Sequence, residues 1–379
     1  MTRYPKQRPG ARSASSSAGA RRPAGRAVMN RCGALCLVAM LWVWSTPGCA
    51  GSPPALTLQR WEASHPAMGT SFRIVCYARD DAHAARAAVD AFARIDALDD
   101  QLSDYDSRSA LSQLGARSDA GPTGPLPVGD DLLRVLQLAA ELARETEGAF
   151  DPTVGPWTQV WRRARRAGVP PGDDVLEALA PSVGHQLLRV DERARTVALD
   201  ARGMRLDLGG IAKGFALDEA LATLARHGIE RALVDGGGDV VVGAPPPGRD
   251  AWRVAIEPFA GEGGGRTVVV ELAHRALATS GDTYRALEHA GLRHGHILDP
   301  RTGRALTDGT GASVLAPDGA RADALASAAC VLGAARALEL CRELEDVELR
   351  VVARDVDGEL ARSTTAGFDA LVVEPPGDG

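Results

Sequence analysis

The segment from Leu206 to Gly214 (LDLGGIAKG) has the pattern of a strand end, a glycine turn and a helix start. Such a turn exposes backbone N–H groups and lets a phosphate group approach the backbone closely. The segment contains Lys213, and the chain has 41 arginines but only two lysines, the other being Lys6. Where arginine is the usual cation, a lysine indicates a site that needs a compact point charge. We therefore predict a phosphate site here; an exposed helical lysine is the alternative.

Asp323 and Ser327 stand four residues apart in a segment that has a helical pattern. This spacing places both side chains on one helix face. Mg²⁺ prefers hard oxygen ligands and commonly takes only one or two from a protein, while water and substrate phosphate fill the rest of its shell. The pair is a candidate magnesium site, although the same spacing also suits an ordinary solvated face.

His294 and His296 precede a Pro-Gly turn in the segment HGHILDPRTG (294–303). No third nitrogen or sulfur ligand is evident, so one histidine acting as a general base is a better reading than zinc binding. Histidines in an ordinary turn remain the alternative. The segment from Asp235 to Asp239 (DGGGD) lacks the GxGxxG spacing and is followed by strands, so we reject a dinucleotide-binding fold for it.

The hydrophobic pattern predicts the elements that must position these residues. Helices are expected over Ala82–Leu102, Asp130–Thr146, Ile211–Arg226 and Arg321–Leu344, and strands over Ser71–Ala78, Ala232–Val234, Val240–Val242, Val254–Ile256, Val268–Leu272, Ser313–Leu315 and Leu349–Ala353. Most of these strands follow the third helix and do not alternate with helices. This order favours an α+β fold over a doubly wound parallel sheet.

Local signals predict where some of these elements begin and end. Asp130 is expected to cap its helix, Gly228 to end the third helix, and Gly333 to break the last one. Residues 165–185 are rich in proline and glycine and resemble a variable insert.

The N-terminus has the features of a targeting segment. Cys32–Trp44 is a run of 13 uncharged, mostly apolar residues, too short for a spanning helix of roughly 20 residues but typical of a signal peptide. It leads to a small residue followed by Cys49, as in bacterial lipoproteins. We expect residues 1–48 to be a leader with a lipoprotein-type signal, Cys49 to carry lipid, 49–61 to be a tether and 62–375 to be the folded domain.

This reading places the protein in the cell envelope, on the periplasmic side of the cytoplasmic membrane, with an ordinary signal peptide as the alternative. Beyond residue 31 the chain has 14 more acidic than basic side chains, which argues against nucleic acid as a partner. Past Cys49, the remaining cysteines Cys76, Cys330 and Cys341 form no CxxC pair and lie in apolar stretches. We expect them to be buried free thiols.

Taken in order, these segments resemble the ApbE family of FAD:protein FMN transferases. The resemblance runs from His65 to about Gly333. It rests on HPAMGT (65–70), LSDYD (102–106) with SALS (109–112), GAFDPTVG (148–155), LDLGGIAKG (206–214), VDGGGD (234–239), ATSGDTY (278–284), HGHILDPRTG (294–303) and ADALASA (322–328). One such segment would be weak evidence, but eight in order make a specific match.

The resemblance implies a fold and an activity. The fold would be α+β, a T-fold-related mixed sheet with helices in two closely fused lobes, with the flavin groove between them. The activity would be the Mg²⁺-dependent transfer of FMN from FAD to a Thr or Ser hydroxyl of an acceptor protein of membrane electron transport, with release of AMP.

The resemblance also implies residue roles. FAD would be contacted by Met68, Tyr105, Ala149, Phe150, Asp151, Asp207, Lys213 and Ile297. Mg²⁺ would be held by the backbone carbonyl of Gly210 and the side chains of Asp323 and Ser327. His296 would lie beside the reacting phosphate as the general base.

The sequence departs from the family pattern at three positions. Ser327 stands where the family usually has Thr, which keeps the oxygen ligand but loses a methyl group. Asp104 stands where Thr often precedes the tyrosine, and Gly115 where Asn is usual. Two other activities stay open: a Mg²⁺-dependent FAD pyrophosphatase that uses water, and a non-catalytic FAD-binding lipoprotein that needs Tyr105 but neither Mg²⁺ nor His296.

Overall fold

An eight-stranded antiparallel sheet supports the rest of the fold in this computed structural model, which describes residues 57–259, 267–281, 286–354 and 359–373. All of these residues belong to one compact unit. In order across the sheet, the strands are β1 (Gln59–Ala67), β2 (Thr70–Ala78), β6 (Ala232–Gly236), β7 (Asp239–Val242), β10 (Arg275–Gly281), β13 (Gly311–Ala316), β14 (Glu348–Arg354) and β15 (Leu360–Thr364).

Side chains that alternate along the strands separate two cores, one on each face of the sheet. In β2, Phe72, Ile74 and Cys76 belong to the main core beneath the helices, whereas Val75 belongs to a second core on the other face. The predicted alternation around these residues is confirmed. Because both faces of the central strands are covered, the sheet holds the elements that line the groove described below in fixed positions.

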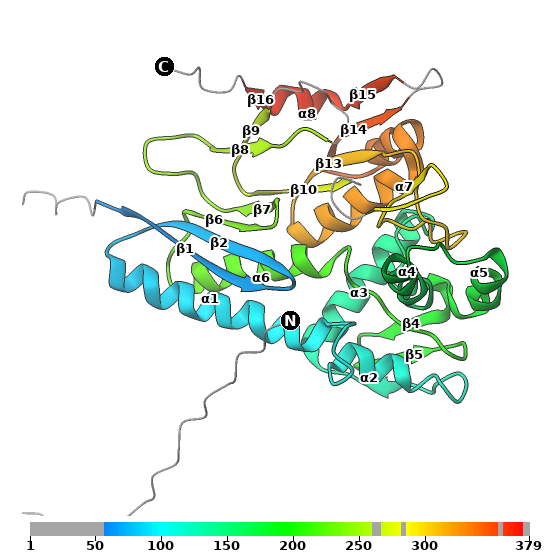
Figure 1. Cartoon of the computed structure of the whole chain (residues 1–379). Helices are drawn as coiled ribbons and strands as arrows, with labels where there is room; N and C mark the ends of the chain where they lie inside the picture. Colours follow the sequence, from blue (N-terminus) through cyan, green and yellow to red (C-terminus); the bar gives the residue numbers. More distant parts are fainter. Residues whose placement is uncertain (1–56, 260–266, 282–285, 355–358, 374–379) are drawn as a thin grey trace, which may run out of the picture. The chain divides into compact units, whose positions relative to one another are not determined.

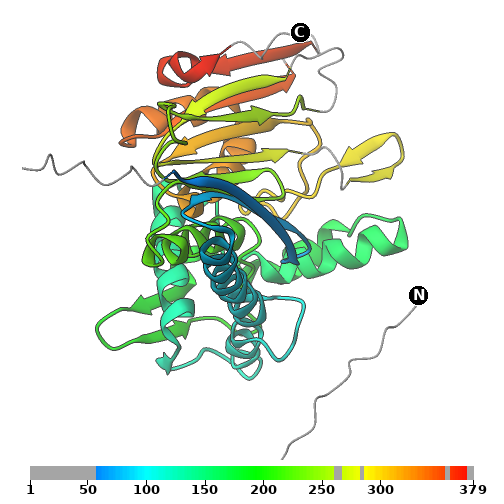
Figure 2. The ribbon, with the colours of Figure 1, turned by 90° about the vertical axis from the view of Figure 1, so that its left-hand side faces the viewer.

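Three helices cover one face: α1 (Asp81–Leu102), α6 (Ala212–Arg226) and α7 (Gly319–Glu343). Figures 1 and 2 show them running over the strands. Their buried stripes are rich in alanine, which lets helix backbones approach each other and the sheet closely. Among the described residues, α7 alone has the length and apolar character of a membrane span. It packs against β10, β13 and β14 as a core helix.

The other face is covered by a small sheet of β16 (Val372–Val373), β9 (Val268–Leu272) and β8 (Trp252–Ile256), together with α8 (Ala366–Leu371). Phe368 of α8 is fully buried in this second core. β11 (Leu287–His289) and β12 (Leu292–His294) form a separate hairpin.

A long insert between α1 and α6 builds the second lobe. It contains α2 (Ala110–Ala116), β3 (Leu126–Pro127), α3 (Asp130–Glu145), α4 (Gly155–Ala167), α5 (Asp173–Leu179), two short 3-10 turns (Ala180–Ser182 and His185–Leu187), β4 (Leu188–Asp191) and β5 (Thr196–Leu199). In both ribbon views most of the insert lies on the opposite side of the large sheet from α8 and β16 (Figures 1 and 2).

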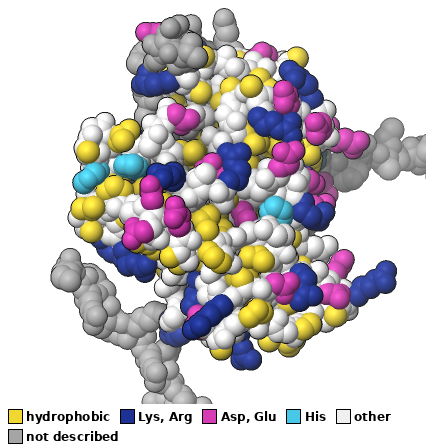
Figure 3. Space-filling view, turned by 90° about the vertical axis from the view of Figure 1, so that its right-hand side faces the viewer, with side chains coloured by type: hydrophobic (Ala, Val, Ile, Leu, Met, Phe, Trp, Pro, Cys, Tyr) yellow, Lys and Arg dark blue, Asp and Glu magenta, His cyan; other side chains and the backbone are white. Residues whose placement is uncertain are grey.

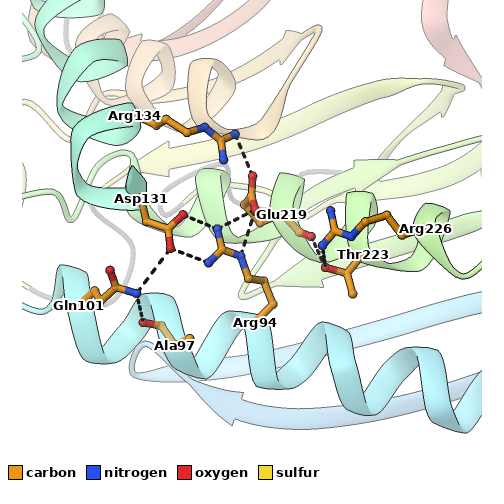
Figure 4. Close-up of polar contacts among 8 residues, drawn as sticks. All are labelled: Arg94, Ala97, Gln101, Asp131, Arg134, Glu219, Thr223 and Arg226. Carbon is orange, nitrogen blue, oxygen red and sulfur yellow. Dashed lines mark hydrogen bonds and ion pairs between the residues drawn. The ribbon is translucent and has the colours of Figure 1, made fainter. Parts of the chain in front are cut away.

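Ion pairs join the insert to the helical layer. Arg94 of α1 donates to both oxygens of Asp131 on α3, at 2.5 and 2.6 Å, and to Glu219 on α6 at 2.7 Å (Figure 4). Arg134 of α3 reaches Glu219 from the other side. Such a bidentate, partly buried arginine fixes geometry better than an exposed pair does.

The face formed by α4 and α5 carries charges of both signs. Figure 3 shows basic and acidic side chains interspersed there with hydrophobic ones. Arg304, from the loop after β12, pairs with Asp173 at the start of α5, at 2.6 Å. This pair joins the loop that carries His296 to the insert.

The α+β class, the predicted helices and the predicted strands are confirmed, with shifts of a few residues at their ends. Gly228 follows α6 with a φ of +75°, and Gly333 interrupts α7 with a φ of +72°, a conformation that glycine adopts without strain. The three described cysteines are buried free thiols.

Two local predictions are wrong. Asp130 does not cap α3, because Gly129 holds the cap position and Asp130 in the first turn pairs with Arg195. The tether predicted over residues 49–61 extends too far, because residues from Gln59 onward already belong to β1 and pair with β2.

The predicted insert over residues 165–185 contains the end of α4 and the whole of α5. Leu176 of α5 packs with the tryptophans of α4 in a small core. The leader, Cys49 and the first part of the tether lie outside the described residues, as do residues 374 and 375.

Candidate active site

A groove of about 380 Å³ lies between the insert, the N-terminal halves of α6 and α7, the end of β10 and the loop after β12. Of the predicted site residues, these line it: Tyr105, Ala149, Phe150, Asp151, Asp207, Gly210, Lys213, His296, Ile297, Asp323 and Ser327. The structure thus brings together residues that are more than 200 positions apart in the sequence. Met68 is not among the lining residues.

The loop before α6 is held in place by its own side chains. The Asp207 carboxylate accepts a hydrogen bond from the Gly209 N–H at 2.8 Å, and the Asp207 N–H donates to Pro152 of the insert. Gly214, in the first turn, lies so close to α7 that a Cβ atom would be 2.0 Å from the carbonyl oxygen of Gly319. This close approach brings Lys213 of α6 next to Asp323 of α7.

Lys213 lies between two buried carboxylates. Its ammonium group is hydrogen-bonded to Asp239 and lies 3.7 Å from Asp323. Burial would lower the pKa of Lys213, but the two carboxylates outweigh it and raise the pKa above its usual value. The lysine therefore stays charged at neutral pH, and with its side chain 31% exposed it still faces the groove.

Asp323 and Ser327 of α7 both line the groove. The Asp323 carboxylate is buried and accepts a hydrogen bond from the Gly214 N–H at 3.3 Å. Burial raises its pKa to about 7, with Asp239 adding to the effect and Lys213 opposing it. Ser327 Oγ lies 3.2 Å from Ser280 Oγ and 3.2 Å from the position of a Cβ atom on Gly210.

These neighbours fit a magnesium ion. A carboxylate, a hydroxyl and the adjoining glycine carbonyl are all hard oxygen donors, the kind that Mg²⁺ prefers. Within the described part of the chain, no cluster of three or more His, Cys, Asp or Glu side chains offers a metal site of another kind.

His296 lies in the groove wall on a loop that is fixed by backbone contacts. Gly295 N–H donates to Leu306 O at 2.7 Å, and Arg165 of α4 donates to Gly295 O at 3.3 Å. The His296 side chain lines the groove, whereas the ring of His294 packs against Trp161, with 5.5 Å between ring centroids. The two histidines therefore have different environments.

Two predicted flavin contacts differ from the rest. Met68 is in the β1–β2 turn, where its N–H donates to Asp99 at 2.8 Å. Asp151 lines the groove, but its carboxylate already accepts hydrogen bonds from Thr153 and from the His185 N–H. The contact of either residue with FAD stays a prediction.

Sequence reasoning missed two charged residues that form ion pairs with groove-lining residues. Asp239, the buried partner of Lys213, belongs to the DGGGD segment, for which the sequence predicts no site role. Arg162 of α4 pairs with Asp104 at 2.5 Å and Asp207 at 3.1 Å. The buried stripe Trp157, Trp161 and Ala164 has helical spacing and could have revealed α4.

The fold and the groove define an enzyme site for a phosphate-bearing ligand. A glycine turn opens a helix, a charged lysine lies beside it, an oxygen donor pair stands opposite, and an exposed tyrosine offers a flat aromatic face. Together these features suit a nucleotide with an aromatic ring.

The chain belongs to the ApbE family, whose family model matches residues 68–351. It is 34% identical over 303 residues to a protein of Treponema pallidum named FAD:protein FMN transferase, covering 76% of this chain and 83% of the relative. A protein of the same name from Vibrio cholerae is 30% identical over 313 residues, covering 80% and 91%.

Solved structures of the family share the fold. The flavin transferase ApbE of Vibrio cholerae superposes with a TM-score of 0.73 at 27% identity, covering 83% of this chain and 99% of the other. The ApbE protein of Thermotoga maritima gives a TM-score of 0.74 at 27% identity, with 83% and 100% covered.

Proposed function

We propose that this protein transfers FMN from FAD to a Thr or Ser hydroxyl of an acceptor protein. The hydroxyl oxygen attacks the FMN-side phosphorus of FAD, the bond from that phosphorus to the bridging oxygen breaks, and AMP leaves. The observation that carries the proposal is the convergence of Lys213, the Asp323–Ser327 pair and His296 in one groove. The name of the relatives supports the same reaction.

The residues of the groove meet the two main costs of this reaction. Negative charge builds on the phosphate oxygens, and the charged Lys213 beside the α6 N-terminus stabilises it. The hydroxyl is a poor nucleophile until it loses its proton, which His296 would accept as the general base. Histidine suits this role because its ordinary titration lies close to neutral pH.

Mg²⁺ would be held by Asp323, Ser327 and the Gly210 carbonyl, and when bound it supplies additional positive charge at the phosphate oxygens. Asp323→Ala should abolish Mg²⁺ binding in calorimetric titration, because a hydroxyl and a carbonyl alone hold a strongly hydrated ion poorly. Ser327→Thr should bind as the parent does, and Ser327→Ala more weakly. Unchanged Mg²⁺ binding in Asp323→Ala would reject the assignment.

The proposal includes a location. A lipid anchor at Cys49 would hold the enzyme on the periplasmic side of the cytoplasmic membrane, and the tether would let it reach an acceptor of membrane electron transport. The anchor and the location rest on the N-terminal sequence, and the kind of acceptor rests on the family resemblance.

Incubation of the purified protein with FAD and Mg²⁺, with and without a flavin-accepting protein, tests the proposal. Flavin that stays on the acceptor through denaturing electrophoresis, with AMP in solution, is the expected result. Free FMN plus AMP in both reactions would instead indicate a pyrophosphatase, and unchanged FAD would indicate a carrier.

A further inference from the structure

Arg162 enters the groove from α4, a helix whose buried tryptophans belong to a small core of their own. Trp157 and Trp161 bury the opposite face of α4, and the Trp161 indole donates to Gly303 O at 2.8 Å. These contacts fix the rotation of the helix. Arg162 therefore projects toward the groove, and its side chain is only 20% exposed.

The guanidinium of Arg162 makes three contacts at once. One nitrogen donates to Asp104 at 2.5 Å, another donates to Asp207 at 3.1 Å, and the flat face lies over the Tyr105 ring, 4.0 Å from its centroid. A planar fork can donate along its edges while its face stacks on an aromatic ring, whereas a compact ammonium group has no flat face to stack.

Without this arginine the neighbouring groups would separate. The carboxylates of Asp104 and Asp207 are both largely buried and repel each other. Tyr105 is 75% exposed. In the described part of the structure, its ring is in contact with the guanidinium of Arg162. The arginine therefore joins a loop, a helix and the glycine turn.

We propose that Arg162 is a positioning residue for flavin binding. It covers one face of the Tyr105 ring, so that the exposed face is presented to the isoalloxazine ring of FAD, and it holds Asp207 in the glycine turn with the same fork. This inference rests on the proposed function, because it takes Tyr105 as the stacking partner of the flavin.

The test compares Arg162→Gln and Arg162→Lys with Arg163→Gln, which removes an exposed arginine from the neighbouring position of the same helix. FAD binding is followed through the quenching of flavin fluorescence, since stacking on tyrosine quenches flavins. Arg162→Gln should weaken FAD affinity roughly five- to twentyfold and leave the bound flavin brighter. Arg162→Lys should recover little of either effect, and Arg163→Gln should match the parent.

Asp104→Asn adds a second readout. It removes one of the two acceptors, so its effect on FAD affinity should be smaller than that of Arg162→Gln, and the double variant should be no worse than Arg162→Gln alone. Thermal melts report whether each variant folds. If Arg162→Gln does not fold, the test uses the FAD affinity and the flavin quenching of Arg162→Lys and Asp104→Asn, each compared with the parent.

The outcomes separate this inference from the proposed function. If the parent binds FAD and transfers FMN while Arg162→Gln shows the parent's affinity and quenching, the positioning role is wrong and the function stands. Full recovery by Arg162→Lys would also overturn it, because charge alone would then suffice. A parent that binds no FAD would reject the proposed function itself.

Discussion

His296 and His294 are two residues apart but face different surroundings. His296 lines the groove, whereas the ring of His294 packs on Trp161. In the proposed reaction, His296 rather than His294 would therefore accept the proton of the attacking hydroxyl.

His296→Asn should slow FMN transfer by roughly 10²–10⁴-fold, as expected for the loss of a general base. FAD affinity should stay within a few-fold, because backbone amides and the flavin contacts hold the substrate. His294→Asn is the matched control and should do much less. Single-turnover transfer and FAD titration measure the two effects; a variant that transfers at the parent rate would refute the base role.

Asp104, the partner of the groove-lining Arg162, has a raised pKa. Burial and the charge of Asp207 raise its pKa to about 6, against the opposing effect of Arg162. A carboxyl group whose pKa is higher in the folded than in the unfolded protein binds its proton more tightly in the folded state. Its contribution to stability is fully present at a pH below the pKa of the unfolded state, which is 3.8 for Asp104. That contribution is lost as the pH rises through about 6.

Asp104→Asn does not titrate, so its free energy of unfolding relative to the parent should rise by about 1–3 kcal/mol between pH 4 and pH 7. Asp106→Asn should show a small opposite trend, because a hydrogen bond from Arg108 lowers the pKa of the exposed Asp106. Urea unfolding at both pH values measures the difference. A pH-independent difference for Asp104→Asn would contradict the raised pKa.

At the scale of elements, the site depends on how closely α6 and α7 approach each other. Gly214 leaves no room for a side chain, because the backbone of Gly319 fills the position of a Cβ atom. Backbone atoms cannot move aside as the end of a flexible side chain can. Any group added there must push the two helices apart, and with them Lys213 and Asp323.

Gly214→Ala should destabilise the protein by about 2 kcal/mol, because the overpacking outweighs the gain of about 1 kcal/mol in helix propensity. FAD and Mg²⁺ binding should weaken as well. Gly124→Ala is the control, since no atom lies within 4 Å of its added Cβ, and it should change stability by less than about 0.5 kcal/mol. Equal denaturant midpoints for the two variants would mean that the helices adjust freely.

In the whole molecule, the folded unit and the predicted N-terminal signal would have separate tasks. The unit that begins near β1 contains every residue assigned to the groove. The predicted signal and Cys49 would decide only where the protein resides. Removing the anchor should therefore change location and leave the chemistry intact.

Cys49→Ala should release the protein from the membrane fraction or leave its leader uncleaved. Cys36→Ala, within the same apolar run, is the control and should keep the parent's distribution. Cell fractionation followed by immunoblotting measures both. Unchanged membrane association of Cys49→Ala would show that this cysteine carries no anchor.

Features that depend only on neighbours along the chain could be predicted from the amino-acid sequence. The glycine turn before Lys213 and the four-residue spacing of Asp323 and Ser327 follow from local geometry, and so does the break at Gly333. The order of the eight segments that resemble the ApbE family was enough to indicate the family, which the family model confirms. Short-range rules suffice for these features because turns and helix faces involve only adjacent residues.

Which charged groups pair with one another could not be predicted in this way, because it depends on the folded structure. Lys213 pairs with Asp239 of β7 and Asp323 of α7, and Arg162 joins Asp104 to Asp207 while it stacks on Tyr105. No spacing in the chain encodes these contacts. They arise because the sheet and its two cores fix where each helix lies, and burial then leaves each charged group only the partners that packing brings within reach.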